Sequence, residues 1–408
     1  MKNQNKPARS NLTILRQLCQ LIPGHLTVKV ARQYQIDSRS ITPWSHVVSM
    51  VYAQLSRAMS LNDVCDGLAI SDKALKEIRG ASVPSRNGLS HCNRHRAAAM
   101  AEELYWAVAS QLCASHSGFA QQHGGKNYAY RFKRGIHLVD ATTVQLVANC
   151  MDWARHRRRK AAVKCHLRLD LQSFLPSFVI IDTARQHEAT RARELCAGLQ
   201  EGEIAVFDKG YLDLEHLNEL HTRGVYWVTR AKDNTAYEVL EERPIQGDQI
   251  LRDCVIQLKY HNAKTAYPQK LRLVRAKVQV DGQEQIMEFI TNNLEWAAAS
   301  VADLYRCRWQ IEIFFRSLKQ NLQIGSILGY NANAVRWQIW MALLVHLLMR
   351  FVRWKSRWQS HFARLFTIVR CTMWLRWDLE STLQFYGTAG AKRRMRANAQ
   401  QAYLPGFL

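Results

Sequence analysis

The chain has 408 residues, with 56 Lys and Arg against 33 Asp and Glu, and a formal net charge of +23. Its length predicts more than one domain, and its 48% hydrophobic and 22% charged content excludes a disordered tail or a collagen-like protein. The large positive excess predicts a polyanionic partner, of which nucleic acid is the commonest.

The apolar and cysteine patterns predict neither export nor a membrane partner. The basic N-terminal segment lacks a smooth apolar stretch with a small-residue cleavage site, so we expect no secretory signal. The most apolar run, residues 339–349, is shorter than the ~20 residues that span a bilayer and predicts a buried core helix. The ten cysteines are scattered without a CxxC pair, which favours a reduced, cytoplasmic protein.

Residues 1–115 are predicted to form a helical N-terminal domain that binds DNA. Ser60 and Asp63 have the spacing of a helix start. Two short helices and then a segment rich in Ser, Asn and Arg follow, an order typical of a helix-turn-helix-like reader of DNA. A plain helical packing domain has the same periodicity. The candidate DNA contacts here are Arg94 and Arg96. Apolar residues recur at three- and four-residue spacing in residues 12–21, 44–59 and 97–112.

The middle of the chain changes to strands that alternate with helices, which is an α/β pattern. The region from 235 to 292 is β-rich, with Asp281-Gly282 as a hairpin turn. A long helix is expected over about residues 301–323, followed by helices rich in Trp and Arg, for which buried packing is favoured over a dimer interface. Strands are expected at residues 136–140, 162–170, 174–182, 203–208 and 225–230, and helices at 189–199 and 213–222.

Two acids, Asp140 and Asp208, each close an apolar strand. If these strands are neighbours and parallel, both carboxylates emerge at one edge of the sheet, where active sites of α/β proteins lie. Two adjacent carboxylates repel each other without a cation, and hard oxygen ligands suit Mg²⁺ or Mn²⁺. Asp170 and Asp182 also end apolar strands, and we interpret them as structural caps, with a catalytic role as the less favoured alternative.

The long helix carries four polar residues on one stripe: Tyr305, Arg308, Glu312 and Lys319. At 100° per residue they fall within about 60° of one another, beside the apolar arc that faces the core. Glu312 would complete a three-carboxylate site for two metal ions that catalyses phosphoryl transfer. Arg308 and Lys319 would hold phosphates, and Tyr305 would donate a hydrogen bond to one.

The pattern Tyr305-x2-Arg308-x3-Glu312-x6-Lys319 resembles the YREK signature of bacterial DDE transposases of the insertion-sequence-four (IS-four) family, at all four positions. The resemblance extends over most of the chain. It implies an α/β fold with an RNase H-like catalytic core, a mixed sheet with flanking helices. A β-strand insertion would interrupt this core, and a helical N-terminal DNA-binding domain would precede it.

Asp140 in VDATT and Asp208 in FDKGY resemble the first and second catalytic acids of that family, with Glu312 as the third. The resemblance implies a cut-and-paste transposase of a bacterial insertion sequence that uses Mg²⁺, for which Mn²⁺ may substitute. It would bind double-stranded DNA, both the terminal inverted repeats and the target, as a homodimer. Cleavage and strand transfer would pass through hairpin ends, in the cytoplasm at the nucleoid and without a membrane.

The expected domains follow this pattern. They are the N-terminal DNA-binding domain over residues 1–115, the first part of the catalytic core over 116–234, the β-rich insertion over 235–292, the second part of the core with C-terminal helices over 293–385, and a basic tail over 386–408.

Further basic residues are candidate DNA contacts. Arg230, in VTRAK, resembles a family position that touches DNA. The resemblance also implies an aromatic platform for a flipped base, for which Trp227 and Trp296 are candidates, each equally typical of core packing. A basic run in an expected loop favours contact with the DNA backbone over a merely solvated charge run. This run includes Arg157, Arg158, Arg159 and Lys160.

Two other function classes stay open. The first is another RNase H-like metal-dependent nuclease or integrase, against which the YREK stripe speaks. The second is a catalytically silent DNA-binding regulator derived from a transposase, against which the intact trio of Asp140, Asp208 and Glu312 speaks.

Overall fold

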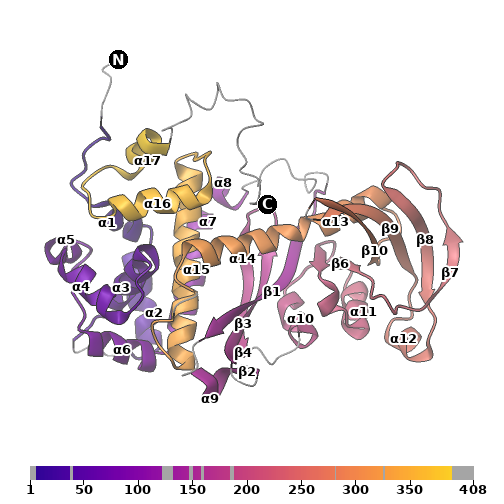
Figure 1. Ribbon diagram of the computed structural model, residues 1–408, viewed down its shortest axis with the longest axis horizontal. Helices are drawn as coiled ribbons and strands as arrows, with labels where there is room; N and C mark the ends of the chain where they lie inside the picture. The colour runs from indigo at the N-terminus through magenta and orange to yellow at the C-terminus, as the bar shows by residue number, and fades with distance from the viewer. Residues whose placement is uncertain are drawn as a thin grey trace. The chain divides into compact units, whose positions relative to one another are not determined.

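The computed structural model describes residues 6–36, 40–121, 132–146, 150–157, 160–183, 188–280, 282–324 and 327–387 (Figure 1). Contacts divide the chain into two compact units. Unit 1 comprises Met1–Ala120, Gln145–Ala161 and Arg316–Leu408, and unit 2 comprises Gln121–Val144 and Ala162–Phe315. This division places the C-terminal helices with the N-terminal ones, whereas we expected them beside the catalytic core. The predicted domain boundaries stay a prediction.

Unit 1 is helical, as predicted for the N-terminal region. Its N-terminal helices are α1 (Ile14–Gln20), α2 (Gly24–Gln33), α3 (Pro43–Ser56), α4 (Leu61–Ala69), α5 (Asp72–Lys76), α6 (Arg86–His95), α7 (Ala99–Ser115) and α8 (Ser117–Ala120). The short α9 (Met151–Ala154) and the C-terminal α15 (Ala332–Lys355), α16 (Phe362–Thr372) and α17 (Leu379–Gly387) complete its helices.

Helix α15 is the centre of unit 1 and contacts α3, α6, α7 and α16. It is long and apolar enough to pass a length-and-composition test for a membrane span, but 94% of its most apolar window is buried inside the protein. The prediction of a core helix is therefore confirmed. The Trp337 indole donates to the Arg96 carbonyl at 2.7 Å, and Gln338 Oε1 accepts from the Leu328 amide at 2.8 Å. These bonds satisfy polar groups that burial would otherwise penalise.

The start of α4 follows the sequence signal. The Ser60 hydroxyl accepts from the Asp63 amide at 3.2 Å, and Asp63 accepts from the Ser60 amide at 2.9 Å. This reciprocal capping box satisfies two amides that the first helical turn leaves without partners.

Unit 2 is built on a mixed sheet in the order β3-β1-β5-β6-β10-β9-β8-β7, with β4 paired to β3 (Figure 1). Strands β1, β5 and β6 are parallel neighbours, and the pairings from β6 through β10 to β7 are antiparallel. The strands are β1 (Ile136–Leu146), β3 (Lys160–Asp170), β4 (Leu175–Thr183), β5 (Ile204–Phe207), β6 (Tyr226–Arg230), β7 (Tyr237–Glu242), β8 (Ile250–Leu258), β9 (Leu271–Val280) and β10 (Gln283–Thr291).

Helices pack on this sheet and enclose an apolar core. Helix α11 contacts β6, and α13 contacts β5, β6 and three strands of the insertion. The core includes Phe207, Trp227 and Tyr267, each at most 1% exposed. The helices of unit 2 are α10 (Glu188–Cys196), the 3₁₀ turn η3 (Lys209–Tyr211), α11 (Leu214–Thr222), α12 (His261–Ala266), α13 (Ala298–Cys307) and the beginning of α14 (Trp309–Asn321).

Three local expectations are corrected. The basic run, expected as a loop, begins with strand β2 (Arg155–Arg157), which pairs antiparallel with the start of β3. The β-rich region also contains the short helix α12, which has no apolar periodicity to announce it. The long helix expected over residues 301–323 is assigned as α13 and α14, which meet at Arg308.

Candidate active site

Strand register brings Asp140 and Asp208 together. Strands β1 and β5 are parallel, and their partnered residues run from Ile136 with Ile204 to Val139 with Phe207. The next residue along the chain is the acid in each case, so the two aspartates lie at the same level. Asp208 directly follows β5, whereas Asp140 lies within β1, which continues to Leu146 and so beyond the predicted strand end at residue 140. The predicted parallel neighbourhood is confirmed, and both residues are half-buried at the edge of the sheet where α/β proteins place their sites.

The third acid is joined to the first through an arginine. Arg308 Nη2 donates to Glu312 Oε1 at 2.7 Å, one helical turn further along α14. The neighbouring Nη1 of the same guanidinium donates to Asp140 Oδ2 at 3.4 Å. One planar cation therefore bridges two of the three predicted catalytic carboxylates, although they lie far apart in the sequence.

Tyr305 holds the remaining acid. Its hydroxyl donates to Asp208 Oδ1 at 3.2 Å, and its ring packs against Phe289 of β10 with centroids 4.7 Å apart. Burial raises the pKa of Tyr305 to about 12; the Asp208 carboxylate acts in the same direction and Arg308 against it. The phenol is therefore a neutral donor at physiological pH.

The electrostatics of Arg308 reflect two opposing effects. Burial lowers the pKa of its guanidinium, but Tyr305 and the three acids around it outweigh burial and raise that pKa overall. The side chains of Arg308 and Asp140 are only 15% and 16% exposed. Their interaction is therefore less screened by solvent than a surface ion pair.

The three carboxylates suit a divalent metal by donor chemistry, because hard oxygen ligands are what Mg²⁺ and Mn²⁺ prefer. As they stand, however, no three or more Asp, Glu, His or Cys side chains within the described part of the chain are arranged to hold a metal ion. Asp140 and Glu312 instead share the guanidinium of Arg308.

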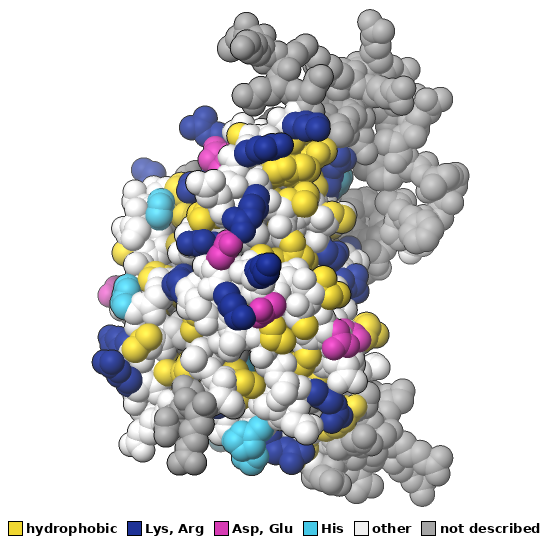
Figure 2. All heavy atoms as spheres, turned by 90° about the vertical axis from the view of Figure 1, so that its left-hand side faces the viewer, with side chains coloured by type: hydrophobic (Ala, Val, Ile, Leu, Met, Phe, Trp, Pro, Cys, Tyr) yellow, Lys and Arg dark blue, Asp and Glu magenta, His cyan; other side chains and the backbone are white. Residues whose placement is uncertain are grey.

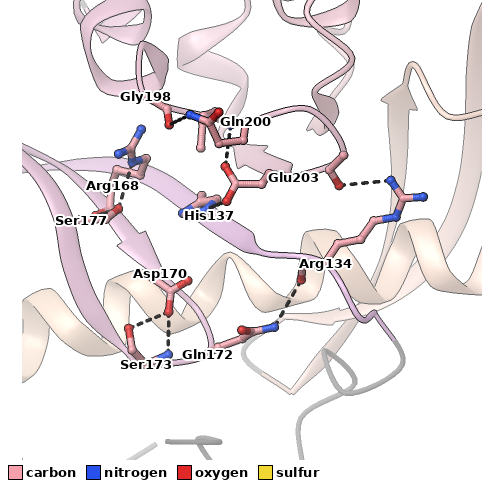
Figure 3. A network of polar contacts seen from close by, with 12 residues as sticks. Arg134, His137, Arg168, Asp170, Gln172, Ser173, Ser177, Gly198, Gln200 and Glu203 are labelled. Carbon is pink, nitrogen blue, oxygen red and sulfur yellow. Dashed lines mark hydrogen bonds and ion pairs between the residues drawn. The ribbon is translucent and has the colours of Figure 1, made fainter. Parts of the chain in front are cut away.

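The two rival acids have structural partners. Asp170 Oδ1 accepts from both the amide and the hydroxyl of Ser173, each at 2.6 Å (Figure 3). It lies at the edge where β1 begins, because the neighbouring Leu171 amide donates to the Ile136 carbonyl, and so away from Asp140. Asp182 pairs with Arg191. Both arrangements fit the interpretation of these residues as caps.

The end of β10 is fixed just before helix α13, which carries Tyr305 and leads to the third acid on α14. Asn292 accepts from the Trp227 amide and donates to the Val225 carbonyl, both at 2.9 Å. The Thr291 hydroxyl donates to the Trp227 carbonyl at 2.6 Å. These bonds fix the end of β10 against β6, just before the chain enters α13.

The predicted DNA contacts in unit 2 and on α14 differ in how far their side chains are exposed. Arg230 is the last residue of β6 and is half-buried. Lys319 is exposed on α14, two turns beyond Glu312. Arg157 ends β2 and Lys160 begins β3, without a description of their side chains, while Arg158 and Arg159 lie outside the described residues.

In unit 1, the two candidate arginines differ sharply. Arg94 is exposed on α6. Arg96 is 9% exposed, and its guanidinium donates to the Ile41 carbonyl and, at 3.3 Å, to the Thr42 carbonyl. Arg96 thus ties the end of α6 to the start of α3. Arg94 can reach DNA because its side chain is exposed, whereas the Arg96 guanidinium is buried on backbone carbonyls. The sequence alone does not reveal this difference.

The candidate aromatic platforms are core residues or half-buried. Trp227 is 0% exposed and stands edge-on to Tyr267 at 5.8 Å. Trp296 packs against Tyr226 at 5.2 Å. Burial of Trp227 fits the packing interpretation, so only Trp296 retains an accessible surface.

Sequence reasoning missed the pairing of Arg308 with the acids themselves. The spacing of Arg308 and Glu312, four residues apart on a helix, was an available signal for an ion pair. The contact with Asp140 had no local signal, since it joins residues that are far apart in the sequence and depends on the tertiary fold.

Comparison with known proteins adds an independent observation. Residues 131–348 match the family model described as transposase DDE domain, and residues 10–78 match a domain of unknown function (DUF4372). The putative transposase y4zB of Sinorhizobium fredii is 28% identical over 71% of this chain and 77% of its own length. The probable transposase for insertion sequence element IS5377 of Geobacillus stearothermophilus is 24% identical over 70% and 74%. Transposase InsG for insertion sequence element IS4 of Escherichia coli is 23% identical over 46% and 43%.

Proposed function

We propose that this chain, which belongs to the transposase DDE domain family, cuts and joins DNA with Asp140, Asp208 and Glu312 as its catalytic acids. The family model covers more than half of the 408 residues. The chain is therefore an enzyme, a transposase of the insertion-sequence type, and DNA is its partner. Asp140 and Asp208 lie at the same level of the parallel neighbours β1 and β5, and Arg308 joins Asp140 to Glu312 of α14; this arrangement supports the assignment of the acids.

The predicted fold class is confirmed. The mixed sheet has parallel β1, β5 and β6 at its centre and an antiparallel extension from β10 to β7, and the family model covers both. This arrangement fits an RNase H-like core interrupted by a β-strand insertion. The similarity to relatives named as transposases of insertion sequences, one of them of IS4, supports an assignment to the IS-four group.

Divalent metal dependence follows from membership in the family. We propose Mg²⁺ as the metal, with Mn²⁺ as a substitute, bound by Asp140, Asp208 and Glu312. When bound, such ions activate a water or a 3′-hydroxyl and stabilise the leaving oxygen. Tyr305 orients Asp208. Lys319, exposed further along α14, offers a point charge to DNA phosphate.

The helical N-terminal region is the proposed reader of the DNA ends. Helix α6 carries Arg86, Asn87, His91 and Arg94 as exposed side chains and has no acidic residue, while Leu89 packs inward. Figure 2 shows one face of the molecule on which Lys and Arg side chains outnumber acidic ones. A basic surface of this kind attracts the DNA backbone.

A cavity of about 200 Å³ lies beside this helix and supports the proposal that this surface binds DNA. It is lined by Arg86 and Arg94 from α6, the first residues of α4 and the segment around Tyr330. Tyr330 is 54% exposed. Two arginines beside an exposed aromatic ring provide partners for a phosphate and a base. We retain Arg94 as a proposed contact and replace Arg96 with Arg86, because the Arg96 guanidinium is committed to backbone carbonyls.

The finer features of the reaction belong to the proposal as well. The substrate ends are terminal inverted repeats, and two copies of the chain synapse two ends. Cleavage proceeds by a cut-and-paste route through hairpin ends, in the bacterial cytoplasm at the nucleoid. These features follow from the resemblance of the Tyr305, Arg308, Glu312 and Lys319 pattern to the family signature.

A strand-cleavage assay tests the proposal. DNA that carries the inverted repeats flanking the coding sequence is incubated with the full chain and Mg²⁺. We expect nicks at the repeat ends, and we expect Glu312→Gln and Asp208→Asn to abolish them while DNA binding persists. Asp213→Asn is the matched control, because Asp213 caps α11 by accepting from the His216 amide at 3.2 Å, a role that Asn fills equally well. Binding by the wild type without any cleavage would indicate a silent regulator instead.

A further inference from the structure

The charge that neutralises two of the three acids belongs to the chain itself. Arg308 Nη1 lies 3.4 Å from Asp140 Oδ2, and Nη2 lies 2.7 Å from Glu312 Oε1. The two contacts use different nitrogens of one rigid, planar group. Carboxylates that converge in this way repel one another unless a cation stands between them, and Arg308 is that cation here.

The guanidinium holds one oxygen of each carboxylate, Asp140 Oδ2 and Glu312 Oε1. Oxygen ligands approach Mg²⁺ at ~2.0–2.1 Å, so an ion bound by these same two oxygens would compete with the guanidinium for them. In the described part of the chain no three acidic side chains are close enough to hold a metal. An ion that uses Asp140 Oδ2 and Glu312 Oε1 would therefore displace Arg308 from them.

The Arg308 side chain does not use all of its hydrogen-bond donors. Its Nε is buried and has no hydrogen-bond partner. A buried donor without a partner costs stability. The guanidinium is held by hydrogen bonds to its two acidic neighbours and also lies over the ring of Tyr305, 5.6 Å from the ring centroid. A metal that engages the two acids would compete for both hydrogen bonds.

We propose that Arg308 is a displaceable internal counter-ion, which holds Asp140 and Glu312 in place before metal binding and leaves when a divalent cation takes over these two carboxylates. The proposal rests on the proposed function, because it takes these acids as metal ligands. The released guanidinium keeps its charge and becomes available to a DNA phosphate. Metal binding and the hold on DNA are thereby coupled through one positioning residue, and the coupling is reciprocal.

Metal affinity measured without DNA tests this proposal apart from activity. Isothermal titration calorimetry of the full chain with Mn²⁺ compares the wild type with Arg308→Gln. We expect the variant to bind Mn²⁺ about tenfold more tightly, equivalent to about 1.4 kcal/mol, because no counter-ion has to be displaced. Arg306→Gln is the matched control two residues away, where the guanidinium pairs with Asp303 at 3.3 Å; its affinity should equal that of the wild type. Equal or weaker binding by Arg308→Gln would overturn the proposal.

Two further variants keep the result interpretable. Arg308→Lys retains the charge but replaces the planar fork by a single ammonium, so we expect an affinity between those of the wild type and Arg308→Gln. This variant decides the question if Arg308→Gln fails to fold, and an affinity equal to the wild type then counts against the proposal. Glu312→Gln should weaken Mn²⁺ binding. If Glu312→Gln binds Mn²⁺ as tightly as the wild type, the metal site of the proposed function is contradicted as well. If Glu312→Gln weakens Mn²⁺ binding and Arg308→Gln leaves it unchanged, only the counter-ion proposal is contradicted.

Discussion

The hydroxyl of Tyr305 lies 3.2 Å from Asp208 Oδ1 and donates a hydrogen bond to it. The second acid is thus held by a neutral donor, while a positive charge on Arg308 holds the first and third. The difference matters because a neutral donor can orient the Asp208 carboxylate without repelling a cation that approaches it, whereas the positive charge of Arg308 would repel one.

Removal of that hydroxyl should have a modest effect. In Tyr305→Phe the ring keeps its packing against Phe289, and only one neutral hydrogen bond is lost, worth ~0.5–1.5 kcal/mol. We expect the single-turnover cleavage rate with Mg²⁺ to fall by about tenfold at most, with unchanged folding by circular dichroism. A loss as complete as that of Asp208→Asn would show that Tyr305 does more than orient the acid.

Neighbouring arginines of unit 1 should separate DNA binding from stability. Arg94 is exposed, so Arg94→Gln should weaken DNA binding and reduce the slope of log affinity against log salt by about one, without a change in the melting temperature. Arg96 is buried on backbone carbonyls, so Arg96→Gln should lower the melting temperature instead. Fluorescence anisotropy over a salt series and thermal unfolding measure the two effects, and an unchanged salt slope in Arg94→Gln would remove this residue from the interface.

A buried ion pair in the insertion should dominate its stability. Arg272 forms two hydrogen bonds with Asp253, at 2.8 and 2.7 Å, and the two side chains are 4% and 5% exposed. Asp253→Asn leaves a buried guanidinium without its counter-charge, so we expect a loss of about 3–5 kcal/mol in urea unfolding. Glu242→Gln, in the exposed pair with Arg252, is the control and should change the unfolding curve little. Equal effects of the two variants would contradict the role of burial.

Acid should destabilise unit 1 through its buried histidines. Burial lowers the pKa of His46 to about 3, an effect that Arg96 strengthens and the hydrogen bond to Asn93 opposes, against about 6.5 in an unfolded chain. Between these values the unfolded state binds a proton that the folded state rejects. Stability is therefore fully present above about pH 6.5 and falls as the pH drops toward 3, by about 1.4 kcal/mol per pH unit for each such group.

His46→Gln should make this acid dependence shallower, because it removes one titrating group. Thermal unfolding measured between pH 7 and pH 4 provides the comparison. His95→Gln, which replaces an exposed histidine of α6, should leave the slope as it is in the wild type. Parallel curves for the wild type and His46→Gln would show that other groups control the acid response.

Local signals in the sequence predicted most elements of the fold. The capping box at Ser60 and Asp63 predicted the start of α4. The turn residue Gly282 has a φ of +78° and joins β9 to β10, as the Asp281-Gly282 pair predicted for a hairpin, although Asp281 itself lies outside the described residues. Helix α12 and strand β2 were missed because each is too short to show a period.

The site was predictable as a set of residues but not as a set of contacts. Strand ends and helical spacing singled out Asp140, Asp208 and Glu312. Which group lies between them depends on how α13 and α14 pack on the sheet, and no local pattern carries that information. The same limit applies to Arg96, whose spacing suggested a DNA contact and whose burial follows from the position of α3.

The register of β1 and β5 makes the enzyme sensitive to one kind of mutation in particular. Since side chains alternate between the two faces of a strand, an insertion or deletion of one residue in β1 before Asp140 would turn its carboxylate to the opposite face, or shift its level against Asp208. Substitutions that preserve the apolar pattern leave this alignment intact. The coding sequence can therefore accumulate such substitutions in this strand and still encode an active enzyme, whereas the gain or loss of a single in-frame codon would inactivate it.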